Sequence, residues 1–382
     1  MNKRIKILQL QTDYHENSHH YSDLGEQVVA AFPRERYDVT SVFFRGGVPE
    51  KEHPLSRAEK VIYLDLPSRA LGGFRLKLLW WLYLFCRREK FDVVICNRYK
   101  QVNLMMLLNR CLKIPVCIGI SHSVFGEYES TWRRRRTRML MAEAWHFVGV
   151  SPAVKQHLIK QNCGFTEKNT VAITNAIDIE QVEADQFSRE AARERLGLPQ
   201  TGRIIGAAGR LAPVKGHLYL LQAFAQVAQK YPDTALTIIG EGKERSSLEQ
   251  EITRLGVQGR VHLLGFRAGA KQYVRAFDIW AMPSLSEGLG LALLEGMCGH
   301  LPIIASDVPA MRPLVEGAGG VLVKPADVPS LVNALEAYFS LSTTDLQMQG
   351  EKAYTYLVKN HGIEQYRFEY RRFVETCLAK AV

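Results

Sequence analysis

The sequence lacks the features that define several protein classes. Its seven cysteines form no Cys-x-x-Cys pair and are odd in number, which favours reduced thiols in a cytosolic protein over disulfides or a zinc site. The longest run without a polar residue is the nine residues 78–86, whereas a membrane-spanning helix needs about twenty. After the basic start, only Ile7 and Leu8 precede further polar residues, so we expect no secretory signal.

What the chain does contain is the composition of a soluble enzyme. Of its 382 residues, 47% are hydrophobic and 23% are charged, which suits two or perhaps three globular domains. The net charge of +10 is uneven. Residues 1–180 hold 27 Lys and Arg against 18 Asp and Glu, and the rest of the chain is nearly balanced. This asymmetry predicts an anionic partner for the first half, such as a phosphorylated acceptor or an anionic membrane.

Short apolar runs typical of β-strands alternate with helical segments in two series, which predicts parallel α/β sheets. The expected strands are 5–10, 38–44, 61–64, 93–96, 116–120 and 147–150, then 204–208, 235–239, 261–264, 279–282, 303–305 and 320–323. We therefore expect two Rossmann-like domains, 1–180 and 181–360, that face a central cleft. A C-terminal helix, 361–382, would pack back on the first domain.

The densest chemical signal follows the expected strand 279–282. Two carboxylates, Glu287 and Glu295, lie eight residues apart, and a Gly-x-Gly follows the first. Eight helical residues span about 12 Å, so the two could reach opposite ends of a sugar nucleotide. Backbone N–H groups at Gly288, Leu289 and Gly290 would lie at a helix N-terminus, which favours anions. The plain alternative is a capped amphipathic helix with surface glutamates.

Three further loops follow expected strands. Arg210 and Lys215 lie five residues apart and could converge on one diphosphate, although two solvated loop cations are the commoner outcome. Gly240-Glu241-Gly242 lacks the third glycine of a dinucleotide fingerprint, because that position is Arg245. His122 ends a strand in the first half, where a lone histidine is more often structural than catalytic.

In the order that they occur, these segments resemble the retaining glycosyltransferases of family 4, which have the GT-B fold. The residues that carry the resemblance are Gly209-Arg210-Leu211 with Lys215-Gly216, Gly240-x-Gly242, Ser284-x-x-Glu287-Gly288-x-Gly290 with Glu295, and Gly299-x-x-Pro302-Ile303. In the first half, His122, 148–151 and 173–178 match as well. The likeness covers nearly the whole chain and is closest over 202–325, where it is similar to bacterial lipopolysaccharide-core transferases.

The resemblance implies a role for each matching residue. Arg210 and Lys215 would bind the donor diphosphate, and Glu287 would touch the transferred sugar or stabilise the reacting centre. Glu295 would hold the ribose hydroxyls, and His122 would line the donor sugar. The loop at Phe266 and Arg267 would face the nucleobase. No Asp-x-Asp pair occurs, which agrees with a metal-independent reaction, and we expect no cofactor.

Three positions depart from the family pattern. The loop after the first strand lacks the usual Gly-Gly and holds His15, Glu16, His19 and His20 instead. We interpret this loop as a variable acceptor loop rather than a metal site. Ala176 replaces a linker glycine, and residues 310–313 lack the usual Gly and Glu.

Two basic segments carry the charge of the first half. The apolar block 78–86 is flanked by Arg and Lys, and we favour a buried helix over membrane insertion because its centre is apolar on every side. Arg133, Arg134, Arg135 and Arg136 form the second segment, which we expect to contact phosphate on the acceptor or on lipid. No recognised nucleic-acid-binding module occurs.

The leading hypothesis is a retaining, metal-independent glycosyltransferase, cytoplasmic and peripheral on the inner face of the membrane. It would move a sugar from a nucleoside diphosphate donor, with UDP favoured, to a phosphorylated lipid-linked glycan such as lipopolysaccharide core. One alternative is a catalytically silent scaffold that binds nucleotide-sugars. The other is an NAD-dependent Rossmann enzyme, which Arg245 argues against.

Overall fold

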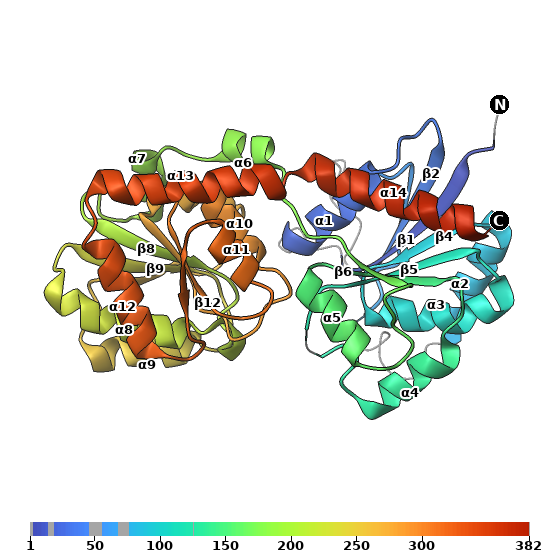
Figure 1. Ribbon diagram of the computed structural model, residues 1–382, viewed down its shortest axis with the longest axis horizontal. Coiled ribbons are helices and arrows are strands. Elements are labelled where there is room, and N and C mark those ends of the chain that lie inside the picture. The colour runs from blue at the N-terminus through green and yellow to red at the C-terminus, as the bar shows by residue number, and fades with distance from the viewer. Residues whose placement is uncertain (1–2, 14–18, 46–55, 68–75, 125, 382) are drawn as a thin grey trace. The chain divides into compact units, whose positions relative to one another are not determined.

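The chain forms two compact units in the computed structural model, which describes all residues except 1–2, 14–18, 46–55, 68–75, 125 and 382. Unit 1 comprises Met1–Asn175 and Glu364–Val382, and unit 2 comprises Ala176–Ile363 (Figure 1). The chain passes from unit 1 to unit 2 after Asn175 and returns to unit 1 at Glu364, so the last helix belongs to unit 1.

Unit 1 is built on a sheet of seven parallel strands in the order β3-β2-β1-β4-β5-β6-β7. The strands are β1 (Ile5–Asp13), β2 (Tyr37–Arg45), β3 (Lys60–Tyr63), β4 (Val93–Cys96), β5 (Val116–Ser121), β6 (Trp145–Gly149) and β7 (Thr170–Ala172). Strands β4 and β5 are buried along their whole length, as expected for a parallel sheet that is covered on both faces.

Helices cover both faces of this sheet. They are α1 (His19–Ala30), α2 (Leu76–Glu89), α3 (Tyr99–Leu112), α4 (Thr131–Leu140), α5 (Pro152–Lys160) and α14 (Ile363–Ala381). In Figure 1, α2, α3, α4 and α5 lie on one face, and α1 and α14 lie on the other. The hydroxyl of Tyr37 donates to Glu375 on α14 (2.8 Å), and Arg367 donates to Gln27 on α1 (2.9 Å). These bonds fix the returning helix to unit 1.

Unit 2 has six parallel strands in the order β10-β9-β8-β11-β12-β13. They are β8 (Arg203–Ala208), β9 (Thr234–Ile239), β10 (Val261–Leu263), β11 (Ile279–Met282), β12 (Ile303–Ser306) and β13 (Val321–Val323). The chain winds outward from β8 in one direction and then returns to β11 to wind in the other. In such sheets, ligands bind at the carboxyl ends of the strands where the direction changes, which here is between β8 and β11.

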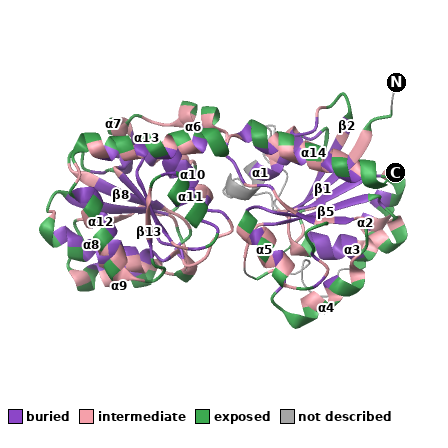
Figure 2. Ribbon diagram, in the orientation of Figure 1, coloured by how far each residue is buried: buried purple, intermediate pink, exposed green. Residues whose placement is uncertain are grey.

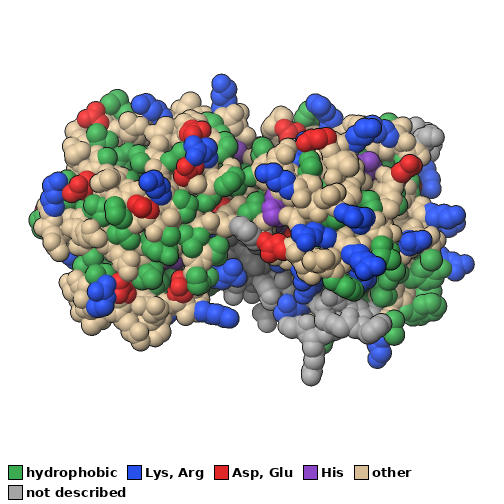
Figure 3. Space-filling view, turned by 60° about the horizontal axis from the view of Figure 1, so that its bottom comes forward, with side chains coloured by type: hydrophobic (Ala, Val, Ile, Leu, Met, Phe, Trp, Pro, Cys, Tyr) green, Lys and Arg blue, Asp and Glu red, His purple; other side chains and the backbone are tan. Residues whose placement is uncertain are grey.

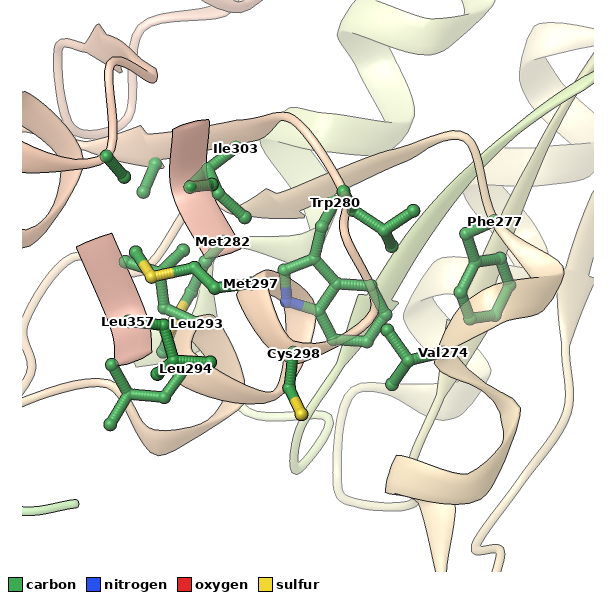
Figure 4. Packing of buried hydrophobic residues seen from close by; sticks show 14 of the residues in the cluster. Val274, Phe277, Trp280, Met282, Leu293, Leu294, Met297, Cys298, Ile303 and Leu357 are labelled. Carbon is green, nitrogen blue, oxygen red and sulfur yellow. The ribbon is translucent and has the colours of Figure 1, made fainter. Parts of the chain in front are cut away.

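The helices of unit 2 bury two hydrophobic cores, one on each face of its sheet. These helices are α6 (Ile179–Asp185), α7 (Arg189–Leu196), α8 (His217–Lys230), α9 (Arg245–Leu255), α10 (Leu291–Cys298), α11 (Arg312–Gly317), α12 (Val328–Phe339) and α13 (Thr343–Asn360), with short 3-10 turns η2 (Pro213–Lys215) and η3 (Ala270–Ala276). Trp280 lies at the centre of one core, against Val274, Met297 and Cys298 (Figure 4). Phe224 and Leu335 belong to the other core. The strands are buried and the outer helix faces are exposed (Figure 2).

The expected fold class is confirmed, because both units are parallel α/β sheets. Helix α4 begins at Thr131 and contains five arginines, which are good helix formers; Ser130 is at its N-cap but makes no capping hydrogen bond through its side chain. Two local features differ from the sequence-based expectation. The three-residue strand β7 was not predicted. Helix α2 is buried on one side only: Leu78, Leu82, Phe85 and Cys86 are buried, but Leu76, Trp80 and Leu84 are exposed.

Candidate active site

The loop between β8 and α8 carries Arg210 and Lys215 and is held tightly from two sides. Its backbone N–H groups at Gly209 and Leu211 donate to Ile239 and Glu241 in the next strand–helix loop. Gly216 has φ +67°, and a Cβ there would lie 2.0 Å from the Pro283 oxygen. Only glycine therefore allows this loop to pack against the segment after β11. Arg210 is exposed, and Lys215 is partly buried.

Lys215 and Glu287 form an ion pair. Lys215 Nζ lies 2.6 Å from Glu287 Oε1, and their side chains are 23% and 12% exposed. The backbone brings them together, because the Leu285 N–H donates to the Val214 oxygen at 2.8 Å. The structure thus joins two of the predicted site residues, which are 72 positions apart in the chain.

Helix α10 begins directly after the Glu287 loop. Its N-cap is Gly290, with φ +97° and no side-chain cap. The first N–H groups of a helix have no partner within the helix, so an uncapped end is suited to bind an anion. Glu295 lies in the second turn of α10 and is 6% exposed. One strand–helix connection therefore positions both predicted carboxylates.

Close contact with β11 fixes α10. The Trp280 ring N–H donates to the Ala292 oxygen of α10 at 2.8 Å. A Cβ on Gly296 would lie 2.3 Å from the Trp280 ring, so the helix can approach the strand only with glycine there (Figure 4). The position of Glu295 depends on this packing.

The Gly-x-Gly after β9 packs closely against the loop that carries Arg210. A Cβ on Gly240 would lie 1.9 Å from the Gly209 oxygen, and one on Gly242 would lie 2.2 Å from the Leu211 oxygen. Arg245, which replaces the third fingerprint glycine, pairs with Glu241 and Glu249. Both glycines let this turn pack against the loop that carries Arg210.

Arg267 lies further along the same sheet edge, in the loop after β10. Its loop is joined to the β9 loop, since the Gly240 N–H donates to the Gly265 oxygen at 2.9 Å. Phe266 and Arg267 are both exposed. Strand β10 is two strands away from β8, on the side opposite to β11.

Two buried polar side chains next to the pair were missed from the sequence. His217, the first residue of α8, is 2% exposed, and Ser284, which follows β11 and Pro283, is 1% exposed. His217 Nδ1 and the Ser284 hydroxyl make no hydrogen bond with any described residue. Burial, and then the Lys215 charge, lower the pKa of His217 to about 4, so its ring is neutral at physiological pH. In the sequence, the signal that could have identified them is their position directly after Gly216 and Pro283, in the two loops that carry Lys215 and Glu287.

In unit 1, His122 follows β5, as expected from the sequence. Burial, followed by the nearby Arg98 charge, lowers the pKa of His122 to about 3. Its imidazole is therefore neutral and offers a hydrogen bond rather than a charge.

Glu127 is a second unit 1 residue that sequence reasoning missed. The Ser121 hydroxyl donates to its Oε2 at 2.5 Å. Burial raises the pKa of Glu127 to about 7, against the opposing effects of the Ser121 bond and the Arg98 charge. The Glu127 carboxyl can therefore gain or lose a proton near neutral pH.

The predicted arginine cluster lies on α4, and its members differ. Arg133 donates to the Gly126 oxygen (2.6 Å) and lies over the Tyr99 ring (4.9 Å), while Arg134 donates to Gln161 (3.4 Å). Arg136 lies over the Trp132 ring at 5.3 Å. Exposed Arg135 makes no hydrogen bond or ion pair with the described residues. Arg133 and Arg134 thus stabilise unit 1 itself, and Arg135 and Arg136 face outward.

The described part of the chain contains no cluster of three or more His, Cys, Asp or Glu side chains that could hold a metal ion. Residues His15 and Glu16 lie outside the described residues, and the side chains of His19 and His20 are also not described. Within the same residues, no helix is both long and apolar enough to cross a bilayer.

The chain has two Rossmann-like units, which is the architecture of the GT-B glycosyltransferases. Unit 2 carries Arg210, Lys215 and Glu287 in the loops that follow β8 and β11. Comparison with known proteins agrees. A family model described as "Glycosyltransferase Family 4" matches residues 26–181, and one described as "Glycosyl transferases group 1" matches residues 188–355. The chain belongs to glycosyltransferase family 4, and it is an enzyme of that class.

Relatives with assigned activities point in the same direction. An Escherichia coli protein named UDP-Gal:alpha-D-GlcNAc-diphosphoundecaprenol alpha-1,3-galactosyltransferase is 26% identical over 319 residues, covering 79% of this chain and 80% of the relative. The lipopolysaccharide core biosynthesis mannosyltransferase LpsB of Rhizobium meliloti is 27% identical over 178 residues, or 44% of this chain and 50% of LpsB.

Solved structures share the fold. HepE of Anabaena, crystallised with UDP and glucose, has a TM-score of 0.79 and 21% identity, over 98% of this chain and all of that one. WaaG, a glycosyltransferase involved in lipopolysaccharide biosynthesis, has a TM-score of 0.74 and 16% identity, over 96% of this chain and 98% of WaaG.

Proposed function

We propose that this chain is a retaining, metal-independent glycosyltransferase that uses a UDP-sugar. Its acceptor would be a phosphorylated, lipid-linked glycan at the membrane, of the lipopolysaccharide core type. The observation that carries the proposal is the Lys215–Glu287 contact at 2.6 Å, beside the uncapped start of α10. The lipid-linked substrate named for the E. coli relative and the UDP bound by HepE support the choice of acceptor and donor.

The negative charge that develops on the leaving diphosphate explains why the site needs Lys215 and Arg210. When the sugar–phosphate bond breaks, negative charge grows on the diphosphate, so fixed cations stabilise the transition state more than the ground state. Lys215 has three N–H donors. One can stay on Glu287 while others contact phosphate oxygen, so the ion pair orients the ammonium before the donor arrives. Arg210 and the first N–H groups of α10 would supply the remaining contacts.

The acceptor would attack on the face that the diphosphate leaves, with a phosphate oxygen accepting the hydroxyl proton. A double displacement through Glu287 is disfavoured, since a carboxylate paired with Lys215 is a weaker nucleophile. Glu287 would instead hold the transferred sugar, and Glu295 the ribose. His122, whose imidazole is neutral, would hydrogen-bond the sugar.

The test is a transfer assay with purified protein. UDP-, GDP- and ADP-sugars are offered with a lipid-linked core glycan, either phosphorylated or dephosphorylated, and the anomeric configuration of the product is read by NMR. We expect transfer from a UDP-sugar with retention, and a preference for the phosphorylated acceptor. An inverted product would contradict the mechanism. Full activity after Lys215→Ala and Glu295→Ala would contradict the assignment of the site.

A further inference from the structure

The outward face of α2 is an apolar stripe that no described residue of unit 1 covers. Leu76, Trp80 and Leu84 follow each other at every fourth residue and are 65%, 63% and 46% exposed. The opposite face, with Leu78 and Leu82, is buried. Of the ten exposed large hydrophobic residues among those described, six lie on α2, α3 and α4. Such clustering marks an interaction surface, because single exposed apolar residues are normally scattered.

Cations border this stripe. Lys77, Arg87 and Arg88 lie on α2 and are exposed. The one acidic residue of α2 is Glu89, which is neutralised by Arg88 at 2.9 Å and by Lys60 at 3.3 Å. The face therefore combines apolar side chains with unbalanced positive charge.

Helix α4 also carries exposed apolar side chains and cations. Trp132 and Met139 are 64% and 69% exposed and lie seven residues apart, on one face of the helix. Outward-facing Arg135 and Arg136 lie between them, and α4 has no acidic residue. Helix α3 packs against both α2 and α4. Figure 3 shows hydrophobic side chains beside Lys and Arg side chains on unit 1.

We propose that α2 and α4 form a docking face for an anionic lipid bilayer. Leu76, Trp80, Leu84, Trp132 and Met139 would enter the boundary between headgroups and acyl chains, where tryptophan is favoured. Arg87, Arg135 and Arg136 would contact lipid phosphates. The proposal rests on the proposed function for its purpose, since a lipid-linked acceptor requires an enzyme at the membrane. Nucleic acid would match the charge but not the leucine stripe.

Vesicle flotation tests this face. The full chain is mixed with vesicles of phosphatidylcholine, with or without phosphatidylglycerol. We expect binding only when phosphatidylglycerol is present, and a loss of at least about tenfold in the triple variant Leu76→Ser, Trp80→Ser and Leu84→Ser. Arg135→Gln and Arg136→Gln should each weaken binding about fivefold. The matched control is Met348→Ser with Val358→Ser, which changes exposed apolar residues on α13 of unit 2. This control should bind like the wild type.

Insertion can be separated from simple adsorption. Bromine-labelled lipid should quench tryptophan fluorescence in the wild type and less in Trp80→Phe with Trp132→Phe, because Trp145 and Trp280 are buried and Trp81, which is partly buried against Phe85, is the one other tryptophan left. Equal flotation of the triple variant, which should melt at the wild-type temperature, would overturn the proposal. Binding to heparin but not to vesicles would also overturn it, in favour of a polyanion partner.

A parallel assay keeps the two proposals distinguishable. In detergent, with a soluble acceptor, the triple variant should transfer sugar at the wild-type rate, since none of its substitutions lies in the candidate active site. If the wild type binds vesicles but transfers no sugar, the proposed function fails and the docking face stands. If it transfers sugar but does not bind vesicles, the docking face fails alone.

Discussion

Glu127 of unit 1 has a carboxyl whose pKa is well above that of a surface glutamate. The Ser121 hydroxyl, the Tyr99 N–H and the charges of Arg98 and Arg133 face its carboxyl, yet burial still raises its pKa to about 7. In the unfolded chain this pKa is near 4.5. The folded state therefore binds more protons between these values, and stability falls as pH rises through that window.

Replacing this carboxyl should remove the effect. Relative to wild type, Glu127→Gln should be more stable at pH 8, by up to a few kcal/mol, and the difference should shrink towards pH 5. Urea unfolding at both pH values measures this. Exposed Glu129 lies on the same loop, and Glu129→Gln should show no such pH dependence. If the unfolding free energies of the two variants depend on pH in the same way, burial does not raise the pKa of Glu127.

At the scale of single elements, the α10–β11 contact determines where the carboxylates lie. Gly296→Ala would place a methyl group 2.3 Å from the Trp280 ring. Overpacking of this kind costs about 1–3 kcal/mol, and the displaced helix would misplace Glu295. We expect a lower melting temperature and weaker UDP binding by calorimetric titration. Gly259→Ala is the control, because a Cβ there meets nothing within 4 Å. Equal melting of both variants would contradict the close-packing account.

The elements also show what the sequence could and could not predict. Strands such as β8 and β11 are short apolar runs that end in loops rich in glycine, and both were predicted close to their bounds. Helix α2 was harder, because Leu76, Trp80 and Leu84 are as apolar as the buried side, and composition alone does not reveal an uncovered apolar face. Three-residue β7 is too short for a periodic signal.

The contacts of the site depend on tertiary structure. Sequence motifs identified Lys215 and Glu287 separately, but their contact arises because β8 and β11 are neighbours in the sheet. That neighbourhood follows from the winding order, which no local pattern encodes. Buried His217 and Ser284 were missed for the same reason: they lie where the loop after β8 packs against the segment after β11.

At the scale of the whole molecule, the two units should be stabilised separately. In unit 2, Arg193 is completely buried and pairs with Asp278 at 2.8 Å, while its Nε donates to the Ala276 oxygen. Asp278 also accepts the Ile204 N–H at 2.7 Å. This network joins α7 to the start of β8 and β11.

Arg193→Met should destabilise unit 2 by about 3–5 kcal/mol, because it leaves Asp278 buried with less compensation. Hydrogen exchange should show faster exchange in β8, β9 and β11 and unchanged exchange in β1, β4 and β5. Lys230→Met, which removes an exposed pair with Glu336, should change neither. Equal loss of protection in both sheets would show instead that the molecule unfolds as one cooperative body.

The most direct test of the account is the kcat of Lys215→Met, measured with and without EDTA. If a fixed ammonium group takes up the leaving-group charge, wild-type kcat is unchanged by EDTA, and Lys215→Met lowers kcat by about 10²–10³-fold. Lys230→Met, at the exposed far end of α8, should match the wild type. A wild-type kcat that collapses in EDTA, or a Lys215→Met enzyme that keeps full kcat, would contradict the account.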